Sequence, residues 1–454
     1  MSQSSAQLTE GSVGRHLARM SLPMMAGIFA MMTFNVVDTW FVAKLGTEQL
    51  AAISFTFPVI MVISAVAIGL GAGTSSIVAR AIGSGNWPRV QRLATDALVL
   101  SAIIGFILAL VGYLTIDPLF SAMGANEQTL PLIREYMSIW YFGAVFLILP
   151  MVGMSAIRAT GDTRLPSTLM IAAAILNMIL DPILIFGFGP VPALGLEGAA
   201  LASVIARVLS LLATLVVLKV KVDMLAFRFK SFKDLASSWR EVLHVGLPAA
   251  GTNAIIPVAT GLATAMIAGF GQSAVAGFGV ATKVESVVLI LFYALSSVIG
   301  PFCGQNLGVG DKERILKSLW LCTAFSLISG VVLAIFLWLA GAKIAALFDP
   351  QPSVVAVAVL YFVWVPLSYG AAAMVMIMNA AFNGLGRPMP AVAVSVGRMI
   401  FLFLPLAWLG KEYFGLAGIF GALMVANVVS GFGAYWWLRN TVRNDSTLMP
   451  QAAS

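Results

Sequence analysis

The sequence is poor in charge, cysteine and histidine. Only 10% of its 454 residues are Asp, Glu, Lys or Arg, and it has two Cys and two His. Soluble domains carry about 25% charged residues, so the composition excludes a soluble globular fold. The cysteines, Cys303 and Cys322, are too few for a disulfide framework, and together with two histidines they offer too few ligands for a His/Cys metal centre. We therefore expect no cofactor.

Several catalytic and targeting motifs are also absent. The chain has no Walker motif, so ATP hydrolysis does not power it. The apolar segments offer no Ser–His pair, which argues against an intramembrane hydrolase. The N-terminal segment before the first apolar run is polar and lacks a cleavable signal sequence, so we expect the first apolar segment to direct insertion. The glycine-rich IGLGAG at 68–73 has no preceding strand, and we interpret it as helix packing.

Apolar residues dominate the sequence. They make up 60% of the chain, and the mean hydropathy is +0.97. The apolar runs lack period-two alternation and are too long for barrel strands, so we predict an all-α polytopic membrane protein. Twelve runs are long enough to span a bilayer: 20–43, 50–82, 93–115, 131–156, 165–188, 195–218, 241–270, 275–302, 316–340, 354–382, 389–410 and 415–438.

Basic residues predict the orientation of these spans. With the N-terminus in the cytoplasm, nineteen Lys and Arg lie on the cytoplasmic side and four on the other. This is a clear positive-inside bias, so we expect both termini in the cytoplasm. The net charge of +7 then reflects basic cytoplasmic loops, and we expect no nucleic-acid partner.

The two halves of the chain repeat one another at a constant offset. Gly83-Ser84-Gly85-Asn86 matches Gly308-Val309-Gly310-Asp311, and Leu22-Pro23 matches Leu247-Pro248. After a five-residue shift, Gly195 matches Gly415. Six spans per half give parallel repeats. We predict an N-terminal lobe at 1–218, a cytoplasmic linker at 219–240 and a C-terminal lobe at 241–454, with a central cleft between pseudo-symmetric lobes.

Two aspartates, Asp38 and Asp181, lie deep within apolar spans of the first half. Counting about 1.5 Å per residue places Asp38, in the first span, and Asp181, in the fifth, roughly 22–24 Å from the cytoplasmic side. An ionisable group inside a membrane costs about 2.5–3.5 kcal/mol and is a functional candidate by default. Helix packing alone would not require two acids at one depth, so we predict that they form a site.

Neutral polar residues at similar depth accompany the two acids. Asn35 and Asn177 precede them by three and four residues and share their helical faces. Tyr136 and Ser203 fall near the same level on the fourth and sixth spans. For Asn35, Tyr136 and Ser203 a purely structural hydrogen bond stays an open alternative.

Two facing carboxylates in a low dielectric do not both ionise easily. Asp38 and Asp181 would therefore share a proton, or bind Na⁺ together with Asn177. Either event changes the local charge and favours one conformation over another. We hypothesise a coupling site for H⁺ or Na⁺.

The second half lacks these acids, since Ala263 stands at the position equivalent to Asp38. Lys283 and Glu285 lie in the eighth span, two residues apart, and do not face each other. They are interpreted either as members of structural ion pairs or as cleft residues. Arg207 and Arg398 also fall inside spans, without an assigned role.

Four motifs together resemble the multidrug and toxic compound extrusion (MATE) family over almost the whole chain. They are VDTWFVAKLGTEQLAA at 37–52, ARAIGSGN at 79–86, RATGDTRLP at 158–166 and GQNLGVGD at 304–311. The chain looks most similar to the DinF-like branch, whose cation or proton site uses an Asp, a Tyr and an Asn-x-x-x-Asp pair. The matching positions are Asp38, Tyr136, Asn177 and Asp181. A threonine usual on the sixth helix would fall at or near Ser203, which departs from the pattern.

The resemblance also implies a hinge and a function. Bending of the first helix at a proline makes Pro23 a hinge candidate, although a proline there could equally start a helix. The implied function is antiport of amphipathic, often cationic drugs against H⁺ or Na⁺ across a bacterial inner membrane, contributing to antibiotic resistance. We expect a monomer in the lipid bilayer.

Two other transport classes compete with this interpretation. A flippase for lipids or lipid-linked precursors would need a strongly cationic cleft, whereas the second half offers only Lys283 and Arg398 and the first half offers acids. A channel would not need an asymmetric acid site. We therefore rank both below a carrier.

Overall fold

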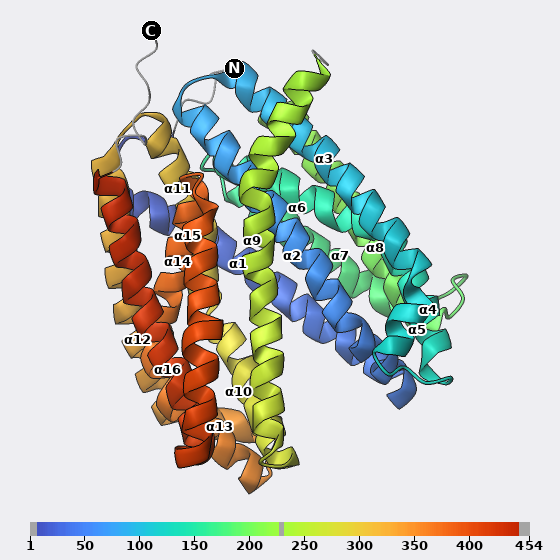
Figure 1. Ribbon diagram of the computed structural model, residues 1–454. Helices are drawn as coiled ribbons and strands as arrows, with labels where there is room; N and C mark the ends of the chain where they lie inside the picture. The colour runs from blue at the N-terminus through green and yellow to red at the C-terminus, as the bar shows by residue number, and fades with distance from the viewer. Residues whose placement is uncertain (1–6, 227–230, 445–454) are drawn as a thin grey trace. The chain divides into compact units, whose positions relative to one another are not determined.

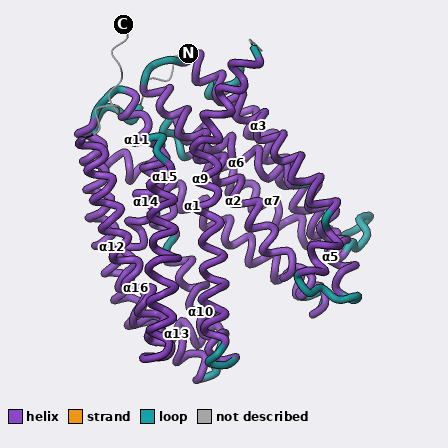
Figure 2. The backbone as a smooth tube through the Cα atoms, in the orientation of Figure 1, coloured by secondary structure: helices purple, strands orange, loops and turns teal. Residues whose placement is uncertain are grey.

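Helices make up almost the whole protein. The computed structural model describes residues 7–226 and 231–444, and within these ranges it contains no β-strand, only an isolated bridge between Phe188 and Val191 (Figures 1 and 2). The predicted all-α fold is confirmed.

The first half of the chain forms eight helices and the start of a ninth. In chain order they are α1 (Val13–Ala43), α2 (Thr47–Gly83), α3 (Trp87–Leu114), α4 (Ile116–Ala122), α5 (Thr129–Phe142), α6 (Ala144–Ala159), α7 (Arg164–Phe186), α8 (Gly195–Val216) with the π-helical turn η1 (Val217–Lys221), and α9 (Phe232–Ala268). Helix α2 packs against α3, α5 and α6, and α8 packs against α5, α6 and α7.

The second half repeats this pattern. Its elements are α10 (Gln272–Val288), α11 (Ile290–Gly308), α12 (Lys312–Phe348), α13 (Pro352–Trp364), the 3₁₀ turn η2 (Val365–Ser368), α14 (Tyr369–Gly384), α15 (Pro388–Val396), the π-helical segment η3 (Gly397–Phe403) and α16 (Leu404–Asn444). Helix α14 is central, because α11, α12 and α16 all pack against it.

Breaks within helices explain how these elements relate to the predicted spans. Ten helices of the described chain are long and apolar enough to cross a membrane, and α5 with α6, bent by 42°, makes an eleventh span. Helix α16 is interrupted at Gly415, whose φ of 59° is not helical, so it comprises two helices. Dividing it there, and joining α10 to α11 across Leu289, gives the predicted number of twelve.

The sequence repeat is also a repeat of backbone conformation. Gly85 and Gly310, which stand at equivalent positions of the two halves, both adopt left-handed φ values, of 72° and 78°, which glycine adopts without steric cost. The next residues, Asn86 and Asp311, cap the following helices, each accepting a hydrogen bond from the backbone nitrogen three residues later (3.1 and 3.0 Å). The same turn therefore stands at the same place in each half.

The chain divides into two compact units at different places from the predicted lobes. One unit contains Leu22–Ala250, and the other contains Leu8–Ser21 and the chain from Gly251 onward. Helices α1 and α9 therefore each begin in one unit and continue in the other. Residues 227–230 of the predicted linker lie outside the described residues.

Close packing explains why the start of α9 belongs to the first unit. A Cβ on Gly69 of α2 would lie 2.4 Å from the backbone oxygen of Gly246, so only glycine allows this approach. The Trp239 indole also donates a hydrogen bond to the Asp96 carbonyl of α3 (3.0 Å). Sequence hydropathy does not report such backbone contacts, which is why the predicted boundary fell elsewhere.

Hydrogen bonds to the second unit hold the segment before α1. The Arg314 guanidinium donates to the carbonyls of Gly11 (2.7 Å) and Leu8 (2.9 Å), and the Leu8 amide donates to the Gln305 side chain (3.1 Å). These contacts explain why the segment before α1 belongs to the second unit.

Candidate functional site

Helices α1 and α7 lie side by side within the first unit. The Ser167 hydroxyl donates a hydrogen bond to the Pro23 carbonyl, and a Cβ on Gly27 would meet Ser167 Cα at 3.2 Å. Further along both helices, the rings of Phe41 and Phe186 meet edge to face with centroids 6.1 Å apart. The two predicted acids lie on the stretch between these contacts, one on each helix.

Asp181 is the most deeply buried member of the site. It is 0% exposed, and Asn177, one turn earlier on α7, is 3% exposed. Oriented to satisfy its neighbours, the Asn177 amide donates from its nitrogen to both Asp181 carboxylate oxygens (2.9 and 3.0 Å). Its oxygen then accepts from the hydroxyl and backbone nitrogen of Ser203 on α8 (3.2 Å each). Asp181, Asn177 and Ser203 thus form one hydrogen-bonded network across two helices.

Asp38 of α1 lies near these hydrogen-bonded residues. Its side chain is half-buried, and its buried Oδ1 has no hydrogen-bond partner among the described residues. It interacts electrostatically with Asp181 and with Arg207 of α8. The buried Tyr136 of α5 lies within electrostatic range of all three charged groups. The site therefore combines groups from α1, α5, α7 and α8.

Arg207 is the member that we did not predict. It is one turn beyond Ser203 on α8, and its guanidinium carbon lies 5.0 Å from the ring centroid of Trp140, a cation–π distance. Trp140 is one turn beyond Tyr136 on α5, so facing pairs on two packed helices meet here. The i,i+4 spacing of Ser203 and Arg207 was the sequence signal that could have identified it.

The structure does not bring Asn35 to the other site residues. Its side chain is exposed and donates to the Met31 carbonyl of its own helix (3.0 Å), a local bond that asparagine commonly makes. Pro23 lies inside α1, one residue after the division between the two compact units.

The second unit contains a separate polar network. The Tyr361 hydroxyl donates to the Glu285 carboxylate at 2.5 Å, and Tyr361 is 1% exposed. Lys283 is exposed and belongs to a different face of α10. Tyr361 is the repeat equivalent of Tyr136, so a buried tyrosine stands at this position in both units.

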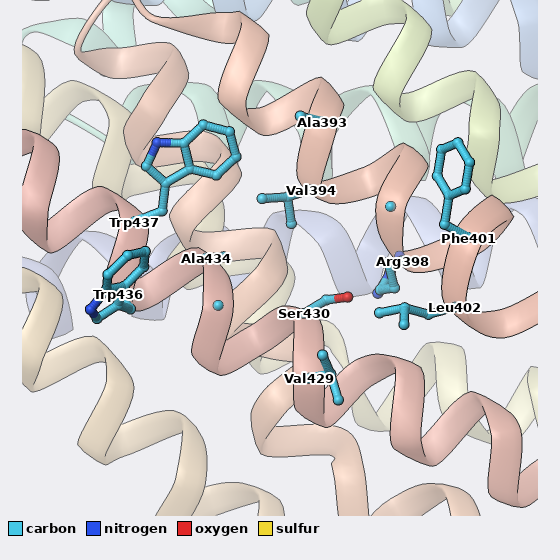
Figure 3. Close-up of a pocket in the computed structure, with 12 residues that line it drawn as sticks. Ala393, Val394, Arg398, Phe401, Leu402, Val429, Ser430, Ala434, Trp436 and Trp437 are labelled. Carbon is cyan, nitrogen blue, oxygen red and sulfur yellow. The ribbon is translucent and has the colours of Figure 1, made fainter.

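Arg398 supplies the positive charge of this network. It interacts electrostatically with Glu285, and its Nη1 donates to the Asn427 side chain (3.3 Å). Asn427 in turn donates to Ser368 (3.0 Å). Arg398 also lines an apolar cavity of about 360 Å³, with Phe401 and Trp437 among its walls (Figure 3).

A known protein-family model matches each half of the chain separately, in agreement with the sequence repeat. The MatE family model matches the chain twice, at residues 23–183 and 248–409, so that the two matches begin at the equivalent prolines Pro23 and Pro248. The chain belongs to the MATE family of transporters. It is therefore a multi-pass membrane transporter and not an enzyme.

Individual MATE relatives match over nearly their full length. The chain is 42% identical to the "FAD transporter" of Shewanella oneidensis, covering 94% of this chain and 95% of the relative. It is 26% identical to the "Multidrug export protein MepA" of Staphylococcus haemolyticus, covering 96% of each. Its fold matches the Vibrio cholerae MATE transporter VcmN in the bent form with a TM-score of 0.91 and 30% identity, over 96% of this chain and 99% of that structure.

Proposed function

We propose that this MATE transporter is a cation-driven antiporter that exports amphipathic organic compounds, and that Asp38 and Asp181 take up the driving cation. The supporting observation is a charge imbalance. Two carboxylates and one guanidinium, that of Arg207, interact at the site, which leaves one excess negative charge when both acids are ionised. An uncompensated buried charge is costly, so the site favours uptake of one positive charge.

The second unit offers no such imbalance. Its interacting charges are one carboxylate, Glu285, and one guanidinium, Arg398. These charges cancel, and the Tyr361 hydroxyl satisfies the carboxylate. The asymmetry supports a coupling site in the first unit and a structural role for the second network.

Cation uptake would drive transport by a population shift. A ligand moves a conformational equilibrium only by its differential affinity for two states. A bound cation neutralises the excess negative charge of the two acids, so burying the site no longer costs the desolvation energy of that charge. The cation-loaded and empty sites therefore favour different conformations. The positive-inside bias supports cytoplasmic termini, and the bacterial relatives support an inner-membrane location.

A flavin dinucleotide is a second candidate substrate. The relative with 42% identity is named as a FAD transporter, whereas MepA is named for multidrug export. FAD carries a pyrophosphate and differs in charge from a cationic drug. Transport measurements can therefore separate the two substrate classes.

Efflux from proteoliposomes tests the proposal. Vesicles containing the full chain are loaded with either ethidium or FAD, and a pH gradient or a sodium gradient is imposed separately. We expect one gradient to accelerate release of at least one compound relative to protein-free vesicles. Release of FAD alone would assign the flavin as substrate, and release that responds to neither gradient for either compound would overturn the antiport mechanism.

A substitution in the polar network of the second unit tests whether that network is structural and takes no part in ion coupling. Tyr361→Phe removes the hydroxyl that donates to Glu285 and leaves a buried carboxylate short of one hydrogen bond, which costs ~1–3 kcal/mol. We expect a lower thermal unfolding midpoint in detergent, with gradient-driven efflux retained. Loss of gradient dependence in a folded Tyr361→Phe protein would contradict the structural role.

A further inference from the structure

Lys283 lies on an exposed face of α10, deep within the span that α10 and α11 form. Helix α10 begins at Gln272, and a rise of about 1.5 Å per residue places Lys283 roughly 16 Å from that end. This depth is near the middle of a hydrocarbon core of about 30 Å. A charged side chain at this depth is costly against lipid, and such residues usually face water or a charged partner.

Lys283 has no carboxylate partner among the described residues. It belongs to none of the ion pairs in that part of the chain. Glu285, the nearest acid in sequence, lies on the opposite side of α10, because residues two apart are separated by about 200° around a helix. The Glu285 carboxylate accepts a hydrogen bond from the Tyr361 hydroxyl instead. The described part of the second unit therefore does not compensate the charge of Lys283.

The helical face that carries Lys283 consists of small and polar residues. A Cβ on Gly279 would meet nothing within 4 Å, and the Ser286 side chain is exposed. The apolar packing of the helix lies on the other side, where the Phe278 ring meets Tyr361 with centroids 5.9 Å apart. In alternating steps of four and three residues, with Val280 and Val287 at its edge, the exposed row is Gln272, Ala276, Gly279, Lys283 and Ser286.

Helix α12 of the same unit has an exposed row with similar spacing and a different composition. Its members are all large and apolar, with exposed fractions between 42% and 80%: Phe325, Ile328, Val332, Ile335 and Leu339. This composition is typical of a face in contact with lipid. The row on α10 has no apolar side chain of that size at its centre and carries a charge, so it is typical of a surface that faces water inside the membrane.

We propose that Lys283 binds a phosphate group of the transported compound, so that the substrates of this transporter are amphipathic molecules that carry phosphate. The inference rests on the proposed export function and favours the second of its two candidate substrate classes. The lysine ammonium has three N–H donors and binds phosphate as a compact point charge. Lipid phosphates lie outside the hydrocarbon core, whereas a solute that enters from water can bring its phosphate to the depth of Lys283.

Equilibrium dialysis of three flavins against the full-length protein in phosphatidylcholine nanodiscs tests this role. FAD, FMN and riboflavin share one ring system and differ in phosphate. We expect the wild type to bind FAD more tightly than riboflavin, and Lys283→Gln to weaken FAD binding by about tenfold or more, because a charged hydrogen bond is lost. Lys283→Arg keeps the charge and should bind FAD within about threefold of the wild type. Lys343→Gln, the same change at an exposed lysine of α12, should leave FAD binding unchanged.

Three results would overturn the role of Lys283. They are a wild type that binds FAD no more tightly than riboflavin, a folded Lys283→Gln protein with wild-type affinity for FAD, and a Lys283-dependent loss of FAD binding when phosphatidylglycerol is added to the nanodiscs. The last result would assign the site to a lipid headgroup. None of these measurements uses an ion gradient, so each outcome leaves cation-driven antiport intact. Antiport fails separately, if efflux responds to neither gradient.

Discussion

Replacing Asp38 with asparagine is expected to reduce gradient-driven efflux by about 5–150-fold. This factor corresponds to a coupling free energy of about 1–3 kcal/mol, which is typical of coupled sites. Asparagine matches aspartate in size but cannot change charge. With Asp38 neutral, Asp181 and Arg207 cancel, and the site no longer favours a cation. The measurement compares ethidium and FAD release from proteoliposomes with and without an imposed gradient.

The controls for Asp38→Asn separate loss of coupling from loss of folding. The variant should elute as a monodisperse peak and retain substrate binding, because the substituted carboxylate couples the ion. Glu285→Gln removes the acid of the balanced network and should keep the gradient response. An Asp38→Asn protein with the gradient dependence of the wild type would remove Asp38 from the coupling mechanism.

The helical fold and much of this site follow from the sequence. Hydropathy located the apolar segments, and counting along helices placed Asp38, Asp181 and Asn177 at one depth. The structure connects Asp181 to Asn177 and Ser203 by hydrogen bonds and brings Asp38 within electrostatic range. These side chains could be placed at one level because helical rise is constant, so that depth in a span can be read from residue number; their role in coupling stays a prediction.

Lateral position could not be predicted in the same way. Asn35 shares a helical face with Asp38 by spacing, yet it bonds back to its own helix. Arg207 was left unassigned because its relevant neighbour, Trp140, belongs to a different helix in a distant part of the chain. Counting gives the height of a residue along a helix, whereas contacts between helices depend on rotations that a single sequence does not specify.

The positions at which helices break could not be predicted from hydropathy either. Gly143 separates α5 from α6 with a 42° bend, and Gly415 divides α16. Both lie within or beside apolar segments, where a glycine is also compatible with a straight helix. Only the packing of neighbouring helices decides which glycines bend the chain and which allow a close approach.

Gly198 illustrates close approach, and Gly198→Ala should be among the most damaging single substitutions. A Cβ there would lie 2.3 Å from the Leu184 carbonyl oxygen and 2.9 Å from the Ile185 nitrogen of α7. Both are backbone atoms that no rotamer change can move. The helices α7 and α8 must therefore separate, at a cost of ~1–3 kcal/mol or more.

Separation of α7 from α8 would also disturb the proposed coupling site, since Ser203 lies only five residues beyond Gly198 and donates to the Asn177 side chain. We therefore expect Gly198→Ala to lower the thermal unfolding midpoint in detergent and, in the protein that folds, to weaken gradient-driven efflux. The matched control is Gly261→Ala in α9, where an added Cβ meets nothing within 4 Å and where alanine favours the helix by roughly 0.5–1 kcal/mol. A Gly198→Ala protein that melts at or above the wild-type temperature would show that close contact between α7 and α8 does not hold the site together.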